Sequence, residues 1–256
     1  MKSKIFSKNN FKYIDEGNGT TIILLHGLMG SLSNFKSSVE ELPKKGFRII
    51  MPLLPIYELP LLKTSAKELS NFLHEFVSLL NLDNFFLLGN SLGGHVGLIY
   101  TIKHQKKMKG LILTGSSGLY ENAIGGSFPK RGDYNFIKTK TEEVFYNPKC
   151  AEKSLVDEVF ETVNNRKKLI KILAMAKSAI RHNMKKELPK ITIPTCIIWG
   201  ENDKVTPPKV AEEFHDLISS SQLFWIEKCG HAAMMEHPGI FNKIVIKWIQ
   251  SLKNEN

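Results

Sequence analysis

The chain has 256 residues, of which 42% are hydrophobic and 23% charged, so it can bury the core of one α/β-sized domain. No stretch approaches the ~18 uninterrupted apolar residues of a membrane span, and no apolar run follows the lysines of residues 1–10. Three widely spaced cysteines exclude a disulfide framework and a CxxC metal site. We therefore expect a cytoplasmic protein with no signal peptide, metal or cofactor.

The formal net charge of +10 is unevenly distributed, because residues 128–190 hold 15 Lys or Arg against 8 Asp or Glu. A basic surface can attract nucleic acid, anionic lipid or an anionic substrate. This segment has no recognised nucleic-acid motif and no regularly spaced aromatic residues. We interpret it as a solvated helical face and expect a small-molecule partner, anionic or neutral, rather than nucleic acid or a membrane. Both a monomer and a homo-oligomer are compatible with this composition.

Short runs rich in Ile, Leu and Val alternate with segments of helical period along the chain. Several runs are apolar almost throughout, which is typical of parallel strands covered on both faces. The predicted strands are Thr21–Leu25, Phe47–Met51, Asn84–Leu88, Lys109–Thr114, Thr195–Trp199 and Gln222–Ile226. The predicted helices between and after them include Ser65–Leu80, His95–Lys103 and Pro238–Leu252. This order predicts a parallel sheet with helices on both faces.

Two segments depart from this alternation. Near the start, Phe11–Ile14 and Thr21–Leu25 flank the turn-forming residues 16–19, which predicts an antiparallel hairpin. From Gly115 to about Pro189 there is no convincing strand, and apolar stripes at helical spacing follow Asn147-Pro148. We therefore expect a helical cap at 117–189, inserted into an α/β core formed by 1–116 and 190–256.

A candidate nucleophile follows the fourth predicted strand. Ser91 lies within Gly89-Asn90-Ser91-Leu92-Gly93, directly before a predicted helix. A strand-to-helix turn this sharp projects its central side chain above the sheet and requires small neighbours two positions away. The motif GxSxG is weak evidence by itself, and its placement after a buried strand strengthens it.

A base and an acid follow two other strands. His231 comes directly after the last predicted strand, at the sheet end where Ser91 lies. Asp203 follows the strand Thr195–Trp199, and we favour it over Glu201 because a short side chain loses less freedom in orienting an imidazole. The chain order Ser91, Asp203, His231 fits a catalytic triad whose three members follow different strands of one parallel sheet.

Two backbone N–H groups complete the predicted site. The glycine turn after Thr21–Leu25 lets the N–H of Leu28 point at a developing oxyanion, and the N–H of Leu92 at the helix start supplies a second donor. An ordinary strand–helix turn is the alternative for this segment, and the neighbouring elbow makes it the poorer explanation.

In this order, the motifs HGLMGS, GNSLGG, GENDKVTPP and KCGHAAMMEHP make the chain resemble the α/β-hydrolase superfamily from about Phe11 to Leu252. The resemblance implies a mostly parallel eight-stranded sheet, with the cap inserted after the sixth strand. It also implies a serine hydrolase that works through an acyl-enzyme.

The subfamily is less sharply defined. GNS and KCGH resemble the meta-cleavage-product hydrolases, which split carbon–carbon bonds in anionic dienoates. Arg166 loosely matches the place where those enzymes keep an arginine for the substrate carboxylate, with a solvated helix residue as the alternative. Those enzymes carry tryptophan after the catalytic histidine, whereas this chain has Ala232. We therefore expect a carboxylesterase-like enzyme that acts on small esters. The alternatives are an enzyme that catalyses carbon–carbon cleavage, acyl transfer or perhydrolysis, and a ligand-binding protein with negligible turnover.

Overall fold

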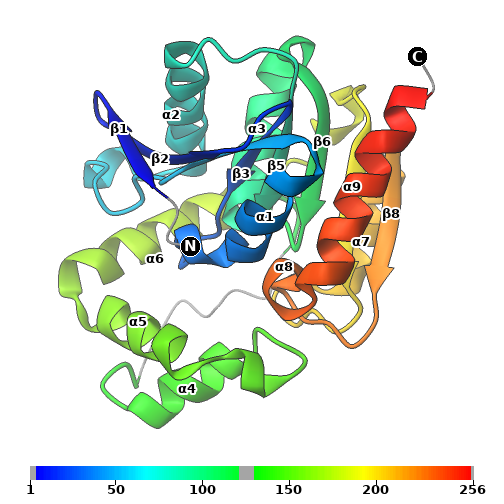
Figure 1. The fold of residues 1–256 in the computed structure, drawn as a ribbon. Coiled ribbons are helices and arrows are strands. Elements are labelled where there is room, and N and C mark those ends of the chain that lie inside the picture. The colour runs from blue at the N-terminus through cyan, green and yellow to red at the C-terminus, as the bar shows by residue number, and fades with distance from the viewer. Residues whose placement is uncertain (1–3, 121–129, 255–256) are drawn as a thin grey trace.

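The computed structural model describes residues 4–120 and 130–254, which are arranged around an eight-stranded sheet (Figure 1). From one edge to the other the strand order is β1-β2-β4-β3-β5-β6-β7-β8. The strands are β1 (Ile5–Lys8), β2 (Phe11–Glu16), β3 (Thr20–Leu25), β4 (Phe47–Pro52), β5 (Phe85–Asn90), β6 (Met108–Thr114), β7 (Thr195–Gly200) and β8 (Ser221–Ile226). Only the pairs β1–β2 and β2–β4 are antiparallel among these strands. The predicted fold class is confirmed.

The six predicted strands of the alternating part are confirmed as β3 to β8, with ends within two residues of those expected. β3 shows why they are apolar throughout. Its alternate residues Ile23 and Leu25 pack into one hydrophobic cluster, while Ile22 and Leu24 pack into the other on the opposite face. Both faces of the parallel strands are therefore covered.

The predicted hairpin is wrong in its pairing. β2 is antiparallel, as expected, but it pairs with β1 and β4, and β4 lies between β2 and β3. Gly17 and Gly19, which have positive φ angles, lie in the connection from β2 to β3. This connection passes the start of β4 instead of forming a hairpin turn between two paired strands. A Cβ on Gly19 would lie 2.3 Å from the carbonyl oxygen of Gly46, so the glycines serve this crossing.

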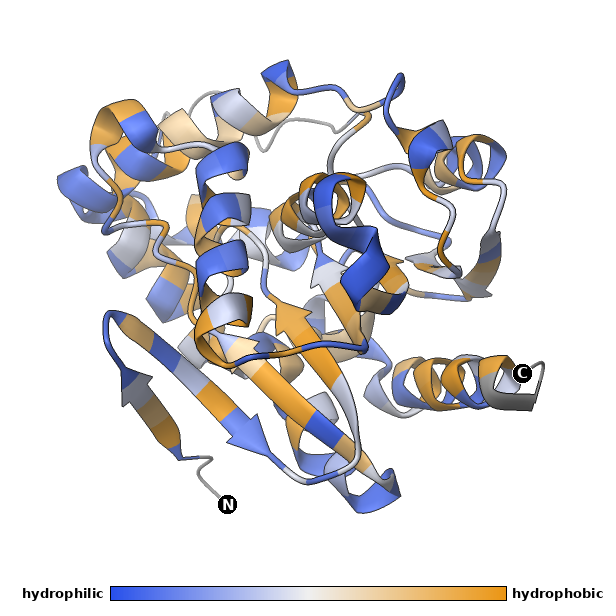
Figure 2. Ribbon diagram, turned by 90° about the horizontal axis from the view of Figure 1, so that it is seen from above, coloured by the Kyte–Doolittle hydropathy of each residue, from blue (hydrophilic) through white to orange (hydrophobic). Residues whose placement is uncertain are grey.

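Helices cover both faces of the sheet. One face packs against α2 (Ala66–Leu79), α3 (Leu92–His104) and α7 (Pro208–Leu217). The other packs against α1 (Lys36–Glu41), the short α8 (Ala233–Glu236) and α9 (Pro238–Asn254). Figure 2 shows the apolar strands enclosed by helices whose polar residues lie outward. The predicted helices correspond to α2, α3 and α9.

Three further α-helices lie among the described residues between β6 and β7, where we expected the insertion. They are α4 (Tyr134–Glu142), α5 (Lys153–Asn164) and α6 (Arg166–Arg181). In Figure 1 they lie beyond the carboxyl ends of the parallel strands. Asn165 begins α6 because its side chain accepts hydrogen bonds from the N–H groups of Lys167 and Lys168. Residues 121–129 of the predicted insertion lie outside the described residues.

Candidate active site

Ser91 occupies the turn between β5 and α3 in a conformation that non-glycine residues rarely adopt, with φ 53° and ψ −120°. Its N–H donates to the carbonyl of Thr114 at 3.2 Å, which ties the turn to β6. A Cβ on Gly89 would lie 2.4 Å from the carbonyl oxygen of Gly93, and one on Gly93 would lie 2.2 Å from a carbonyl of β3. Both flanking glycines are therefore required by backbone contacts of the strained turn.

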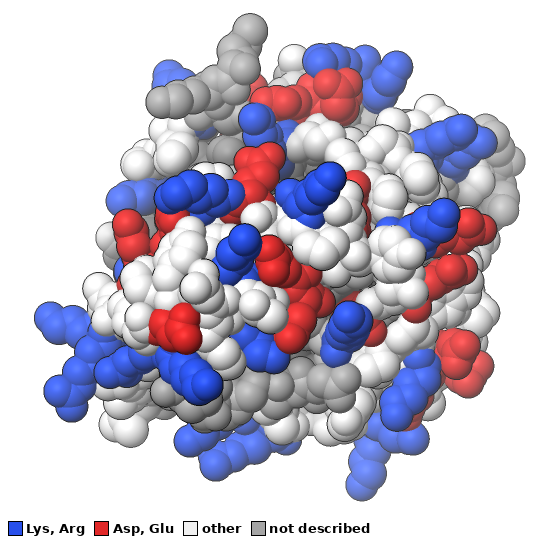
Figure 3. Space-filling model, turned by 90° about the horizontal axis from the view of Figure 1, so that it is seen from below, with Lys and Arg blue, Asp and Glu red and all other residues white. Residues whose placement is uncertain are grey.

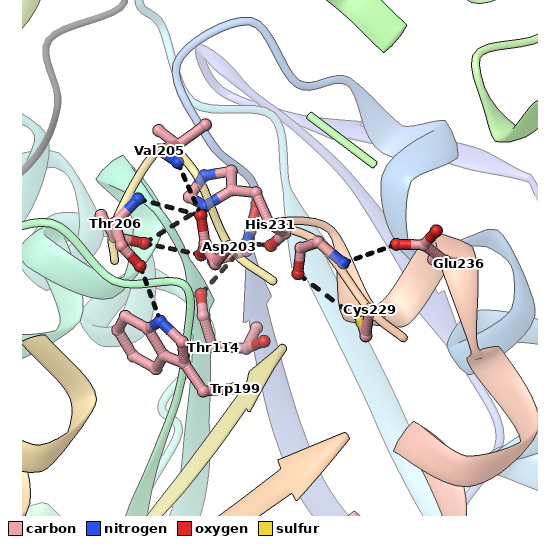
Figure 4. Close-up of polar contacts among 10 residues, drawn as sticks. Thr114, Trp199, Asp203, Val205, Thr206, Cys229, His231 and Glu236 are labelled. Atoms are coloured by element: carbon pink, nitrogen blue, oxygen red, sulfur yellow. Dashed lines mark hydrogen bonds and ion pairs between the residues drawn. The ribbon is translucent and has the colours of Figure 1, made fainter. Parts of the chain in front are cut away.

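Asp203 lies in the turn after β7, and its carboxylate is held by four donors (Figure 4). One oxygen accepts from the N–H groups of Val205 and Thr206 at 2.8 and 2.9 Å. The other accepts from the Thr206 hydroxyl at 2.8 Å and from His231 Nδ1 at 2.9 Å. The indole N–H of Trp199 in turn donates to the Thr206 carbonyl at 2.9 Å. The carboxylate is buried and has one fixed orientation toward the imidazole.

The loop after β8 places His231 between the sheet and the segment around Val144, which follows α4. Its N–H donates to the carbonyl of Val144 at 2.8 Å, and its own carbonyl accepts from the Asn90 amide at 3.4 Å. Because the Asp203 carboxylate accepts from Nδ1, this nitrogen carries the proton, and Nε2 is the basic nitrogen of the ring. His231 and Ser91 line the same cavity.

Two other buried histidines are engaged elsewhere. His26 donates from Nδ1 to the carbonyl of Gly27 at 2.9 Å and accepts at Nε2 from the N–H of Leu54 at 3.1 Å, and its burial lowers its pKa. His95 lies 3.0 Å from His182, Nε2 to Nδ1, and burial lowers the pKa of His95 to about 3. Both rings hold structure together, so neither competes with His231 as a base.

The predicted oxyanion donors lie on two adjoining segments. Leu28 lines the cavity in the turn after β3, which is closed by a hydrogen bond from the N–H of Gly30 to the carbonyl of Gly27 at 3.1 Å. A Cβ on Gly27 would come within 3.3 Å of the Ser91 Cβ, so this turn lies against the elbow. Leu92 is the first residue of α3, and the N–H groups of a first helical turn have no partner within the helix. Both segments therefore border Ser91.

The cavity beside Ser91 has a volume of about 120 Å³ and lies between the carboxyl ends of the strands and residues 140–159. Its walls are mainly apolar, and part of them comes from the segment between β6 and β7. That segment contributes Lys140, Thr141, Val144, Phe145, Leu155 and Val159. Lys140 is the one lysine or arginine among the described residues that line the cavity, and it forms an ion pair with Glu143 at 2.7 Å. Arg166 is exposed at the start of α6 and is not among the described residues that line the cavity.

Acidic side chains interrupt the positive charge of the basic segment at residues 128–190. Figure 3 shows lysines and arginines interspersed with aspartates and glutamates on the face seen from below. Ion pairs join Lys138 to Glu142 at 3.7 Å and Lys153 to Asp157 at 2.6 Å. Within residues 4–120 and 130–254, no group of three or more His, Cys, Asp or Glu is placed to hold a metal ion. No helix in the same ranges is long and apolar enough to cross a membrane.

Two residues that support the site, Thr206 and Glu236, were not predicted from the sequence. The backbone N–H and the hydroxyl of Thr206 are two of the four donors to the Asp203 carboxylate. The position of Thr206 in a turn, three residues after Asp203, is the sequence feature that could have indicated this role. Glu236 accepts from the N–H of Gly230, next to His231, at 2.7 Å. The cavity-lining residues between β6 and β7 had no sequence signal beyond their helical periodicity.

Known proteins are similar to this chain in sequence and in fold. The model of the Hydrolase_4 family, described as "Serine aminopeptidase, S33", matches residues 58–238, more than half of the chain. A 2-hydroxy-6-oxo-6-(2'-aminophenyl)hexa-2,4-dienoic acid hydrolase of Metapseudomonas resinovorans is 26% identical over 251 residues, covering 93% of this chain and 87% of that protein. Lipase 1 of Psychrobacter immobilis is 28% identical over 248 residues, covering 90% and 77%.

A solved structure is similar at higher identity. MGS-MChE2, an α/β-hydrolase enzyme from the metagenome of sediments of the Mar Chica lagoon in Morocco, is 46% identical. The match covers 97% of this chain and 98% of that chain, with a TM-score of 0.80. The chain described here is therefore an α/β-hydrolase in fold and a hydrolase in enzyme class.

Proposed function

The chain belongs to the Hydrolase_4 family of serine hydrolases, and on that premise we propose that it hydrolyses carboxylic esters of small molecules through Ser91, His231 and Asp203. One observation carries the proposal. The buried Asp203 carboxylate accepts hydrogen bonds from four donors, one of which is His231 Nδ1 at 2.9 Å. His231 and Ser91, whose backbone is strained, line one cavity. This is the arrangement that activates a serine hydroxyl.

The mechanism has two acyl-transfer steps. Ser91 Oγ attacks the ester carbonyl while His231 Nε2 takes the hydroxyl proton, and Asp203 stabilises the imidazolium that forms. The N–H groups of Leu28 and Leu92 hold the oxyanion. His231 then gives its proton to the leaving alcohol, the carbon–oxygen bond breaks, and an acyl-enzyme remains. Water repeats the sequence and releases the acid and free Ser91.

We take residues 117–189 as a cap that shapes the acyl site, with residues 1–116 and 190–256 as the catalytic core. The apolar side chains of Val144, Phe145 and Leu155 in the cavity wall favour an apolar acyl group. The charge of Lys140 is offset by Glu143, so the wall favours a neutral substrate over an anionic one.

The test is covalent labelling followed by turnover. Wild type should react with a fluorophosphonate probe at Ser91 and hydrolyse short aryl esters, and Ser91→Ala should lose both activities. Ser78→Ala, which changes an exposed serine of α2, is the matched control and should retain both. Full ester turnover by Ser91→Ala, or no labelling of wild type under conditions that label a reference hydrolase, would refute the mechanism.

A second candidate is cleavage of a carbon–carbon bond in an anionic dienoate. The relative from Metapseudomonas resinovorans is named for such an acid, and Lys140 places one cation in the cavity wall. Wild type and Lys140→Met should be compared on a dienoate and on a neutral ester. A dienoate kcat/KM above that for the ester, lost selectively in Lys140→Met, would favour this candidate over the esterase.

A further inference from the structure

The side chain of Glu236, the last residue of α8, joins two segments that are far apart in the chain. One carboxylate oxygen accepts from the N–H of Gly230 at 2.7 Å and from the N–H of Tyr146 at 3.1 Å. The other accepts from the N–H of Asn147 at 2.6 Å. Gly230 immediately precedes His231, whereas Tyr146 and Asn147 lie between α4 and α5 of the cap. One carboxylate thus links the histidine loop to the cap (Figure 4 shows Glu236 beside that loop).

A second set of contacts holds the same two segments together. The N–H of His231 donates to the carbonyl of Val144 at 2.8 Å. A Cβ on Gly230 would lie 2.5 Å from that carbonyl oxygen and 2.8 Å from the Phe145 Cα, so the two backbones are in direct contact. Val144 and Phe145 also line the cavity. The stretch 144–147 therefore forms part of the substrate wall and of the support for His231 at once.

Hydrogen bonds from N–H groups to an ionised carboxylate are shorter and stronger than those between neutral partners. Three such hydrogen bonds on Glu236 restrain both segments against the end of α8. A general base must be held within hydrogen-bond reach of its proton donor, and a displacement of about 1 Å can cost ~10²-fold in rate. The position of Gly230 determines where the backbone of His231 begins.

We propose that Glu236 is a positioning residue for His231 and couples it to the cap wall of the cavity. This inference rests on the proposed esterase function. Glu236 does not touch the substrate and acts through Gly230 and through residues 146 and 147. Movement of the cap wall is thereby transmitted to the loop that carries the base.

The experiment compares Glu236→Ala and Glu236→Gln with wild type. Glu236→Ala removes all three acceptor contacts, and kcat should fall 10- to 100-fold, on the order expected for a misplaced base, while KM changes about threefold or less. Glu236→Gln keeps one acceptor oxygen and turns the other into a donor that faces N–H groups. It should therefore recover part of kcat, which a merely structural defect would not show.

Asp157→Ala is the matched control, because Asp157 is a cap carboxylate that accepts from the Tyr134 hydroxyl at 2.7 Å and from Lys153 at 2.6 Å, away from the histidine loop. It should leave kcat within twofold of wild type. Hydrogen exchange gives a readout that does not depend on turnover. In Glu236→Ala, residues 144–147 and 228–232 should exchange faster together, and in Asp157→Ala they should not.

The outcomes separate the two proposals. An active wild type whose kcat and exchange survive in Glu236→Ala would overturn the positioning role alone. An equal loss of kcat in Asp157→Ala and Glu236→Ala would also overturn it, because any weakening of the cap would then suffice. An inactive, unlabelled wild type would overturn the esterase function and, with it, the catalytic part of this inference.

Discussion

Gly93→Ala tests how tightly the elbow is packed against β3. The added Cβ would lie 2.2 Å from the carbonyl oxygen of Leu25 and 2.7 Å from that of His26, both of them backbone atoms. Contacts under 3.0 Å force something to shift, so α3 and β3 must separate by about 0.8 Å. Overpacking of this kind costs ~1–3 kcal/mol, and we expect a loss of about 2 kcal/mol in the free energy of unfolding.

Gly97→Ala on the same helix provides the matched control. Its Cβ would meet side-chain carbons of Leu111 and Leu87 at 3.5 Å, which is ordinary contact. Alanine also forms helix better than glycine by up to ~1 kcal/mol, so this variant should be as stable as wild type or more stable. At ~2–4 °C per kcal/mol, the melting temperature should fall by about 4–8 °C in Gly93→Ala and stay level or rise in Gly97→Ala.

Activity gives the second readout of this pair. The backbone that Gly93→Ala displaces leads directly into the turn that carries Leu28, so ester turnover should fall by up to ~10²-fold. Gly97→Ala should keep its turnover. Thermal unfolding followed by circular dichroism and steady-state hydrolysis measure the two effects. A Gly93→Ala protein with wild-type stability and turnover, or a Gly97→Ala protein destabilised equally, would refute the packing argument.

Three further outcomes follow from the site and its surroundings. Asp203→Asn keeps the shape of the acid but presents an amide donor to His231 Nδ1, so kcat for ester hydrolysis should fall ~10⁴-fold, and a loss under tenfold contradicts the triad. The pKa of His95 is about 3 in the folded protein because of its burial, against 6.5 ordinarily, so the unfolded chain binds more protons between these pH values. Stability should therefore fall as pH drops through that window, by up to ~1.4 kcal/mol per pH unit. Urea unfolding at pH 5 and 7 should show a smaller loss of unfolding free energy in His95→Gln than in wild type. An equal loss in both proteins would contradict the assignment to His95. Val159→Trp should fill much of the cavity, lowering kcat/KM for butanoate esters more than for acetate esters, whereas a uniform loss would place Val159 outside the acyl site.

The sheet and the neighbourhood of Ser91 could be predicted from sequence because both depend on local patterns. Apolar runs define parallel strands, and the carboxyl ends of such strands meet at one edge of the sheet. Ser91, Asp203 and His231 each follow a different strand, so their proximity follows from topology alone. The glycines at 89 and 93 could be recognised because the turn itself requires them.

Contacts that depend on distant packing could not be predicted in this way. Glu236 bonds to residues 89 and 90 positions away in the chain, and no local pattern connects them. The pairing of β2 was misassigned because its turn residues favour a hairpin locally, whereas β4 occupies the place beside it. β1 was not predicted at all, since its four residues are mostly exposed and carry little hydrophobic signal.

The connection between β6 and β7 affects how this enzyme can diverge. β6 ends at Thr114 and β7 begins at Thr195, so 80 residues separate two strands that pair in parallel. Loop-closure entropy grows only with the logarithm of length, and each doubling costs about 0.6 kcal/mol. Insertions and deletions in the segment between β6 and β7 should therefore destabilise the sheet little, so that this segment can change the wall of the cavity while the core stays folded. The stretch 144–147 is the exception, because any rearrangement that shifts it away from Glu236 also moves the support of His231.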